Sequence, residues 1–164
     1  MDNYVEHLVK RKDPGYFMIL KLLCIVLDIF GILAAFRFVP GLLLLLLAGI
    51  LSYFVWLYAS VEYEYLYMAG NFTVDMVLNR SRRRKKLETN AEELILIAPK
   101  SSSTARDALR SPCRVMDLSG NGPENLKYAY IFSRGGEKQC CYIEMTDKLL
   151  RELRFHSPSK VKMQ

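Results

Sequence analysis

The sequence lacks the motifs that mark the common enzyme classes. It contains no G-x-x-x-x-G-K-[ST], no G-x-S-x-G, no H-E-x-x-H and no G-x-G-x-x-G. It has four cysteines but no CxxC pair, and its two histidines, His7 and His156, lie far from any cysteine in the sequence. A zinc site needs such ligands at short spacings. We therefore expect a non-enzymatic protein without metal or cofactor, in which all four cysteines are reduced thiols.

The net positive charge of the chain is concentrated in one short segment. The formal net charge is +6, and six positive charges lie close together in the sequence, at Arg80, Arg82, Arg83, Arg84, Lys85 and Lys86. The rest of the chain is therefore close to neutral. The basic character belongs to a local patch, which excludes a uniformly basic protein.

Two apolar runs fill most of the first third of the chain. They cover residues 16–36 and 38–59, and each has about the ~20 residues that a helix needs to cross a ~30 Å hydrocarbon core. The first run is longer than the ~7–15 apolar residues of a signal peptide, and the second follows it at once. The sequence predicts a two-helix transmembrane hairpin over residues 16–59. A basic N-terminus of residues 1–15 precedes it, and a polar domain of residues 60–164 follows it.

Flanking charges predict the orientation of this hairpin. Lys10, Arg11 and Lys12 precede the first run and the basic segment follows the second, whereas the connection contains only Arg37. Loops rich in Lys and Arg stay on the cytoplasmic side. We expect a multi-pass protein of the cell membrane with both termini in the cytoplasm.

Asp28 lies near the middle of the first run. A charged side chain there costs at least ~2.5–3.5 kcal/mol on insertion scales. A hairpin that turns at residues 38–40 brings Asp28 level with residues 49–53, so Ser52 or Tyr53 is expected to hydrogen-bond its carboxyl. Three interpretations stay open: a carboxyl satisfied within the hairpin, a contact to a partner span, and a proton or ion relay.

Small residues predict where the two helices touch. Gly31 and Ala35 form a small-xxx-small pair in the first run, and Ala48 and Ser52 form another in the second. Such pairs let helices approach closely in a membrane, where no hydrophobic force drives them together.

From Val61 onward the apolar residues alternate, which is typical of strands. A Gly-Gly pair at residues 135–136 predicts a β-hairpin, and Thr146 is a candidate cap for a helix near residues 147–155. Residues 101–110 form a short helix or a loop. The expected strands are residues 61–68, 72–78, 82–87, 93–97, 114–118, 127–133 and 138–145. The fold class is therefore α+β: a transmembrane hairpin, a small antiparallel β-rich domain and a C-terminal helix.

This order of short strands and one closing helix resembles a bacterial pleckstrin-homology-like (PH-like) domain in the C-terminal part. The basic N-terminus, residues 62–65, 82–87 and 95–99, and the closing stretch 142–161 also resemble an uncharacterised family of small bacterial two-span membrane proteins. That resemblance implies an architecture in the bacterial inner membrane, and it implies no activity.

The basic segment has three interpretations. It keeps the domain inside the cell along a solvated edge strand, it contacts anionic lipid headgroups, or it binds nucleic acid. A hairpin turning at residues 70–71 places residue 80 opposite residue 61, where the chain leaves the bilayer, and this geometry supports the interpretation as a lipid contact. No nucleic-acid motif accompanies the charges, so no nucleic acid is expected as a partner.

The sequence thus predicts a membrane-tethered interaction or lipid-surface module. Its partners are the bilayer and anionic headgroups, and a second membrane protein or a second copy would contact the hairpin. The alternative is an accessory subunit of a membrane transport complex that uses Asp28.

Overall fold

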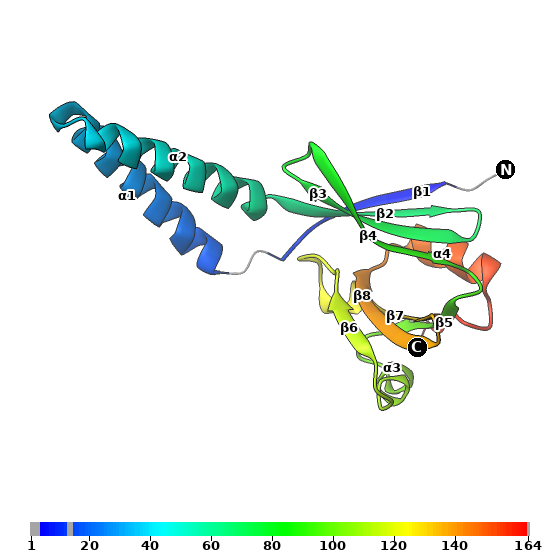
Figure 1. Cartoon of the computed structure of the whole chain (residues 1–164). Helices are drawn as coiled ribbons and strands as arrows, with labels where there is room; N and C mark the ends of the chain where they lie inside the picture. Colours follow the sequence, from blue (N-terminus) through cyan, green and yellow to red (C-terminus); the bar gives the residue numbers. More distant parts are fainter. Residues whose placement is uncertain (1–3, 13–14, 164) are drawn as a thin grey trace. The chain divides into compact units, whose positions relative to one another are not determined.

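The structure, a computed structural model, describes residues 4–12 and 15–163 and divides into two compact units (Figure 1). Of the described residues, one unit holds 4–12, 62–77 and 83–163. The other holds the two long helices and residues 78–82. The ends of the predicted N-terminal segment, residues 1–3 and 13–14, lie outside the described residues, as does residue 164.

The two apolar runs are helices, α1 (Tyr16–Arg37) and α2 (Pro40–Ala59), within two residues of the predicted bounds. Pro40 opens α2, where its missing N–H costs no hydrogen bond. The seam between the helices buries mostly small side chains, whereas most of the large apolar side chains are exposed. The buried seam positions are Cys24, Gly31, Ala34, Gly41, Ala48 and Val55.

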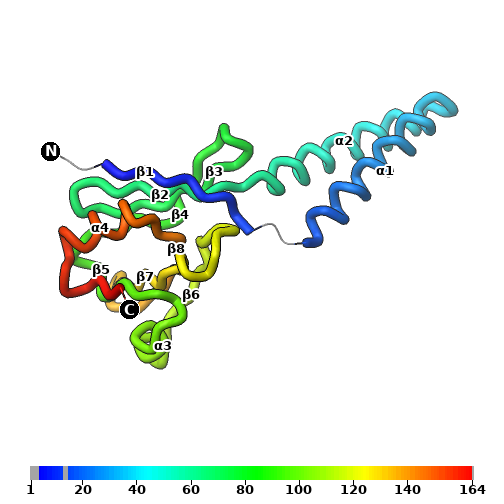
Figure 2. Tube along the Cα trace, turned by 180° about the vertical axis from the view of Figure 1, so that it is seen from behind, coloured from blue at the N-terminus to red at the C-terminus, as the bar shows by residue number. Residues whose placement is uncertain are grey.

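The first sheet has the strand order β1-β2-β3-β4. Figure 2 shows the path of these strands from behind. Three of its strands match the predicted ones: β2 (Val61–Met68), β3 (Asn71–Leu78) and β4 (Arg82–Asn90). The turn between β2 and β3 lies at Ala69 and Gly70, one residue before the predicted residues 70–71. Their φ values of 50° and 85° are the left-handed conformation that hairpin turns use.

The strand β1 (Val5–Lys10) corrects the predicted domain division. Residues 1–15 were expected to be a separate basic segment, but β1 pairs antiparallel with β2, with Val5 opposite Tyr67 and Val9 opposite Tyr63. Val5 and Val9 are buried because they share the core face of the sheet with these tyrosines. The β-rich unit therefore begins before the hairpin and resumes after it.

The second sheet has the order β5-β7-β8-β6, from β5 (Leu94–Pro99), β7 (Lys127–Arg134), β8 (Glu137–Glu144) and β6 (Arg114–Asp117). Gly135 and Gly136, at φ 60° and 83°, make the predicted hairpin turn between β7 and β8. The short strand β6 pairs parallel to β8, so the sheet is not entirely antiparallel as expected. The residues left open by the sequence contain a helix, α3 (Ser103–Ala108), and η1 (Glu124–Leu126) is a short 3-10 helix.

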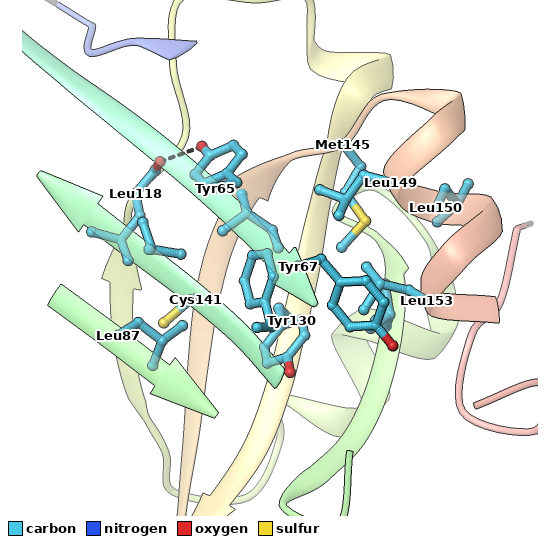
Figure 3. Packing of buried hydrophobic residues seen from close by; sticks show 14 of the residues in the cluster. Tyr65, Tyr67, Leu87, Leu118, Tyr130, Cys141, Met145, Leu149, Leu150 and Leu153 are labelled. Carbon is cyan, nitrogen blue, oxygen red and sulfur yellow. Dashed lines mark hydrogen bonds between the residues drawn. The ribbon is translucent and has the colours of Figure 1, made fainter. Parts of the chain in front are cut away.

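The closing helix α4 (Asp147–His156) covers a core shared by both sheets (Figure 3). The Thr146 side chain caps it by accepting a hydrogen bond from the Leu149 N–H, as the sequence predicts. Leu149, Leu150 and Leu153 are buried against the aromatic side chains of the core. The Tyr65 hydroxyl, buried among them, donates a hydrogen bond of 2.6 Å to the Leu118 carbonyl, so this polar atom is satisfied.

Candidate functional site

The hairpin seam contains one polar pair. Ser52 Oγ donates a hydrogen bond of 2.7 Å to Asp28 Oδ2, so of the two side chains considered from the sequence, Ser52 reaches the carboxyl. The other oxygen, Asp28 Oδ1, is buried and has no hydrogen-bond partner within the described part of the chain. The pair gives Asp28 a contact inside the hairpin.

The basic segment starts beside the end of α2. Asn79 and Arg80 form a tight turn at φ 47° and 55°, and the Asn79 N–H donates a hydrogen bond of 2.9 Å to the Ser60 carbonyl. Residue 79 therefore lies opposite residue 60, two positions from residue 62, which the pairing expected from the sequence would place there. This turn brings the first charge of the segment back to the residue where α2 ends.

The six cations of the basic segment are all exposed, but they are not equivalent. Arg83 forms an ion pair of 3.0 Å with Glu64 on β2, and Lys85 forms one of 2.8 Å with Glu88 on its own strand. Arg80 also interacts with another residue. Arg82, Arg84 and Lys86 have no ion-pair partner among residues 4–12 and 15–163. They occupy alternate positions of β4, so they project to the same side of the strand.

Glu64 is the site residue that the sequence did not reveal. Strand alternation places it beside Glu62 on the face opposite the tyrosines, which usually means solvent, yet Glu64 is only 2% exposed. Its burial raises the pKa of the carboxyl above its ordinary value, and the nearby Arg83 guanidinium partly opposes that rise. Arg83 is thereby drawn toward β2, and one charge of the basic segment is neutralised.

Glu64→Gln is expected to change how the free energy of unfolding depends on pH. Because the folded-state pKa of Glu64 lies above its ordinary value of 4.5, the native state holds the proton more tightly than the unfolded chain does. The stability contributed by this group is present at low pH and is lost as pH rises above 4.5. Relative to the parent protein, the Gln variant should therefore gain stability between pH 4.5 and neutrality, as measured by denaturant unfolding in detergent.

Glu88→Gln is the matched control. The pKa of Glu88 is lowered by its hydrogen bond to Lys85, so its contribution is present above the ordinary pKa and is lost as pH falls. This variant should show the opposite and smaller change, because the Glu88 side chain is well exposed. Identical pH profiles for the two variants would contradict the assignment of Glu64 as a buried acid.

The potential metal ligands of the described chain do not come together. Within residues 4–12 and 15–163, no three His, Cys, Asp or Glu side chains are arranged to hold a metal ion. Burial raises the pKa of Cys140 and of Cys141 to about 12, so both thiols stay neutral at ordinary pH and are poor nucleophiles. The cations of β4 and the hairpin are the candidate functional features of the described chain.

The sequence of this chain matches a known protein family. The model of a family described as a bacterial PH-like domain (DUF6106) matches residues 1–163. The chain belongs to this family. The PH-like match agrees with two sheets closed by a C-terminal helix, but it corrects the predicted placement, because the match includes β1 and the hairpin instead of the C-terminal part alone. No match was found among curated proteins or among solved structures.

Proposed function

We propose that this PH-like protein is a non-enzymatic integral membrane protein. Its hairpin anchors the β-rich domain at the cytoplasmic face of the bacterial inner membrane, and β4 contacts anionic lipid headgroups. One observation carries the anchor: two adjacent helices of 22 and 20 residues expose their large apolar side chains, up to 90% at Phe36. Soluble proteins rarely expose contiguous apolar patches larger than a few hundred Å². In a bilayer these side chains contact lipid instead of water, so their exposure carries no free-energy cost.

The flanking residues support the orientation. Cations precede α1 and follow α2, and the single basic residue of the connection is Arg37. Aromatic side chains of the kind enriched at membrane interfaces lie in the last two turns of α2, at Tyr53, Trp56 and Tyr58. Both ends of the hairpin then face the cytoplasm.

The anchor is tested by extraction and by a reporter. Full-length protein should stay in the membrane pellet after an alkaline carbonate wash, and a fluorescent protein fused at the C-terminus should fold and fluoresce, as it does in the cytoplasm. Release by carbonate would overturn the anchor. A dark fusion that is present in the membrane would overturn the orientation.

Arg82, Arg84 and Lys86 carry the proposed lipid contact. A basic residue near an anionic surface contributes ~1 kcal/mol, so three give ~3 kcal/mol, or about a hundredfold in the docking equilibrium. Arg83 and Lys85 contribute less, because Glu64 and Glu88 already neutralise them. The contact should weaken as salt shortens the Debye length below ~8–10 Å.

Replacing these three cations with Gln should release β4 from the lipid surface. The measurement is energy transfer from a dye on Ser81→Cys, in a Cys113→Ser background, to a labelled lipid in nanodiscs that contain phosphatidylglycerol. Transfer should fall in the triple variant, in phosphatidylcholine alone and in high salt.

A matched triple replacement removes exposed cations elsewhere on the domain, at Arg106, Arg114 and Lys148. It should leave the transfer unchanged. Equal losses in both triple variants would show that net charge alone matters and would contradict a site on β4.

The alternative role, an accessory subunit of a transport complex, depends on Asp28. Its one supporting observation is the buried Oδ1 without a partner in the described chain. The Ser52 hydrogen bond gives Asp28 a role in joining the helices, so the anchor function accounts for the residue without ion movement.

A further inference from the structure

A groove lies on the outer surface of the hairpin, near the end where the chain enters α1 and leaves α2. It is open along one side and has a volume of about 420 Å³, within the range of small-molecule sites. Five of its residues come from the first three turns of α1 and one comes from the last turn of α2. They are Met18, Ile19, Lys21, Leu22, Ile25 and Trp56.

Lys21 supplies the only charge among the lining residues. Its Nζ lies 5.1 Å from the centroid of the Trp56 ring, a cation–π contact. Within the part of the chain that the structure describes, no carboxylate pairs with Lys21. The only acidic residue of α1 and α2 is Asp28, seven residues and therefore ~10 Å further along the helix. The groove thus joins an apolar wall to a cation that has no anion.

We infer that this groove binds one anionic glycerophospholipid, an inference that rests on the proposed membrane anchor. The acyl chain lies along Met18, Leu22 and Ile25, and the headgroup phosphate pairs with Lys21 Nζ. The Trp56 indole N–H donates a hydrogen bond to the same phosphate or to a glycerol ester oxygen. The long Lys21 side chain carries its ammonium toward the headgroups, as lysines near the ends of membrane helices do.

Charge complementarity selects this occupant over a partner helix. An apolar helix seated on the groove would cover Lys21 without neutralising it, and burying an unpaired charge is costly. A zwitterionic lipid brings its own cation beside its phosphate, which competes with Lys21. An acidic headgroup has a phosphate but no cation of its own, so nothing in the lipid competes with Lys21.

Trp56 is the only tryptophan in the chain, so its fluorescence reports on the groove directly. The test uses full-length protein in nanodiscs with brominated lipids, which quench tryptophan on contact. One sample contains a tenth of brominated phosphatidylglycerol in phosphatidylcholine, and the other contains a tenth of brominated phosphatidylcholine in phosphatidylglycerol. One headgroup contact of ~1 kcal/mol predicts about fivefold enrichment of the anionic lipid at Trp56.

Lys21→Gln should abolish this preference, and Lys21→Arg should keep it. Arg37→Gln, at the other end of the hairpin, and the triple Gln variant of β4 should keep it as well. Equal quenching by both brominated lipids, or loss of the preference only in the β4 variant, would overturn the groove site while leaving the anchor intact. No quenching by either lipid would overturn the anchor itself.

Discussion

Gly41→Ala is expected to push the two helices of the hairpin apart. A Cβ atom at position 41 would lie 2.2 Å from the Ala34 carbonyl carbon, 2.3 Å from its oxygen and 2.5 Å from the Ala35 nitrogen. These are backbone atoms of α1, which cannot move aside as the end of a flexible side chain does. Overpacking of this kind costs ~1–3 kcal/mol, which raises the population of separated helices by about tenfold.

The thiol of Cys24 reports the separation, because it is buried in the same seam at 2% exposure. In detergent micelles and in a Cys113→Ser background, its reaction with a maleimide should accelerate by about tenfold in the Gly41→Ala variant. Gly49→Ala is the matched control, since a Cβ there meets nothing within 4 Å and alanine favours the helix. A Cys24 that reacts equally in both variants would contradict the packing of the seam.

The elements that the sequence predicted well are those with local signals. Two runs of about twenty apolar residues give α1 and α2 within two residues, since nothing in them competes with a helix. Gly135-Gly136 gives the turn between β7 and β8, because both positions need a positive φ. Thr146 gives the start of α4, because its side chain accepts the Leu149 N–H.

The elements that the sequence missed depend on distant partners. β1 has only six residues, and its partner β2 begins more than fifty residues later, on the far side of the hairpin. The alternation of Val5 and Val9 with Glu6 and Lys10 is too short to indicate a strand in a segment whose most evident feature is its positive charge. The parallel pairing of β6 with β8 has the same origin, because nothing in four residues specifies the strand beside which they lie.

The sequence predicts the basic strand, but it does not predict which of its cations form ion pairs. The charges of β4 can be counted from the sequence, but the turn lies at Ala69 and Gly70, so the strand returns in a different register from the one that a turn at residues 70–71 predicts. That Arg83 meets Glu64 depends on a side chain of β4 reaching across β3 to β2, which alternation alone does not describe. The groove at Lys21 and Trp56 depends in the same way on how α1 and α2 pack.

Leu149→Ala is expected to destabilise the β-rich domain by ~2–5 kcal/mol, the cost of a cavity in a packed core. Leu149 is fully buried and belongs to the cluster that joins both sheets to α4. Phe155→Ala on the same helix is the matched control: Phe155 is 80% exposed, so its removal should change the free energy of unfolding little. The substitution also leaves helix propensity almost unchanged at position 149. The difference in unfolding free energy between the two variants therefore reports the effect of burial.

Cys141 provides the measurement, because it is fully buried in the same cluster as Leu149. Its labelling by a maleimide, followed along a denaturant series in the full-length protein and assigned by peptide mass spectrometry, should shift to lower denaturant in Leu149→Ala. Cys24 labelling should not shift, because the hairpin forms its own compact unit. Conversely, Gly41→Ala should expose Cys24 and leave Cys141 protected. Joint exposure of both thiols in either variant would contradict two separately packed units, and an equal effect of Phe155→Ala would contradict the placement of α4 against the sheets.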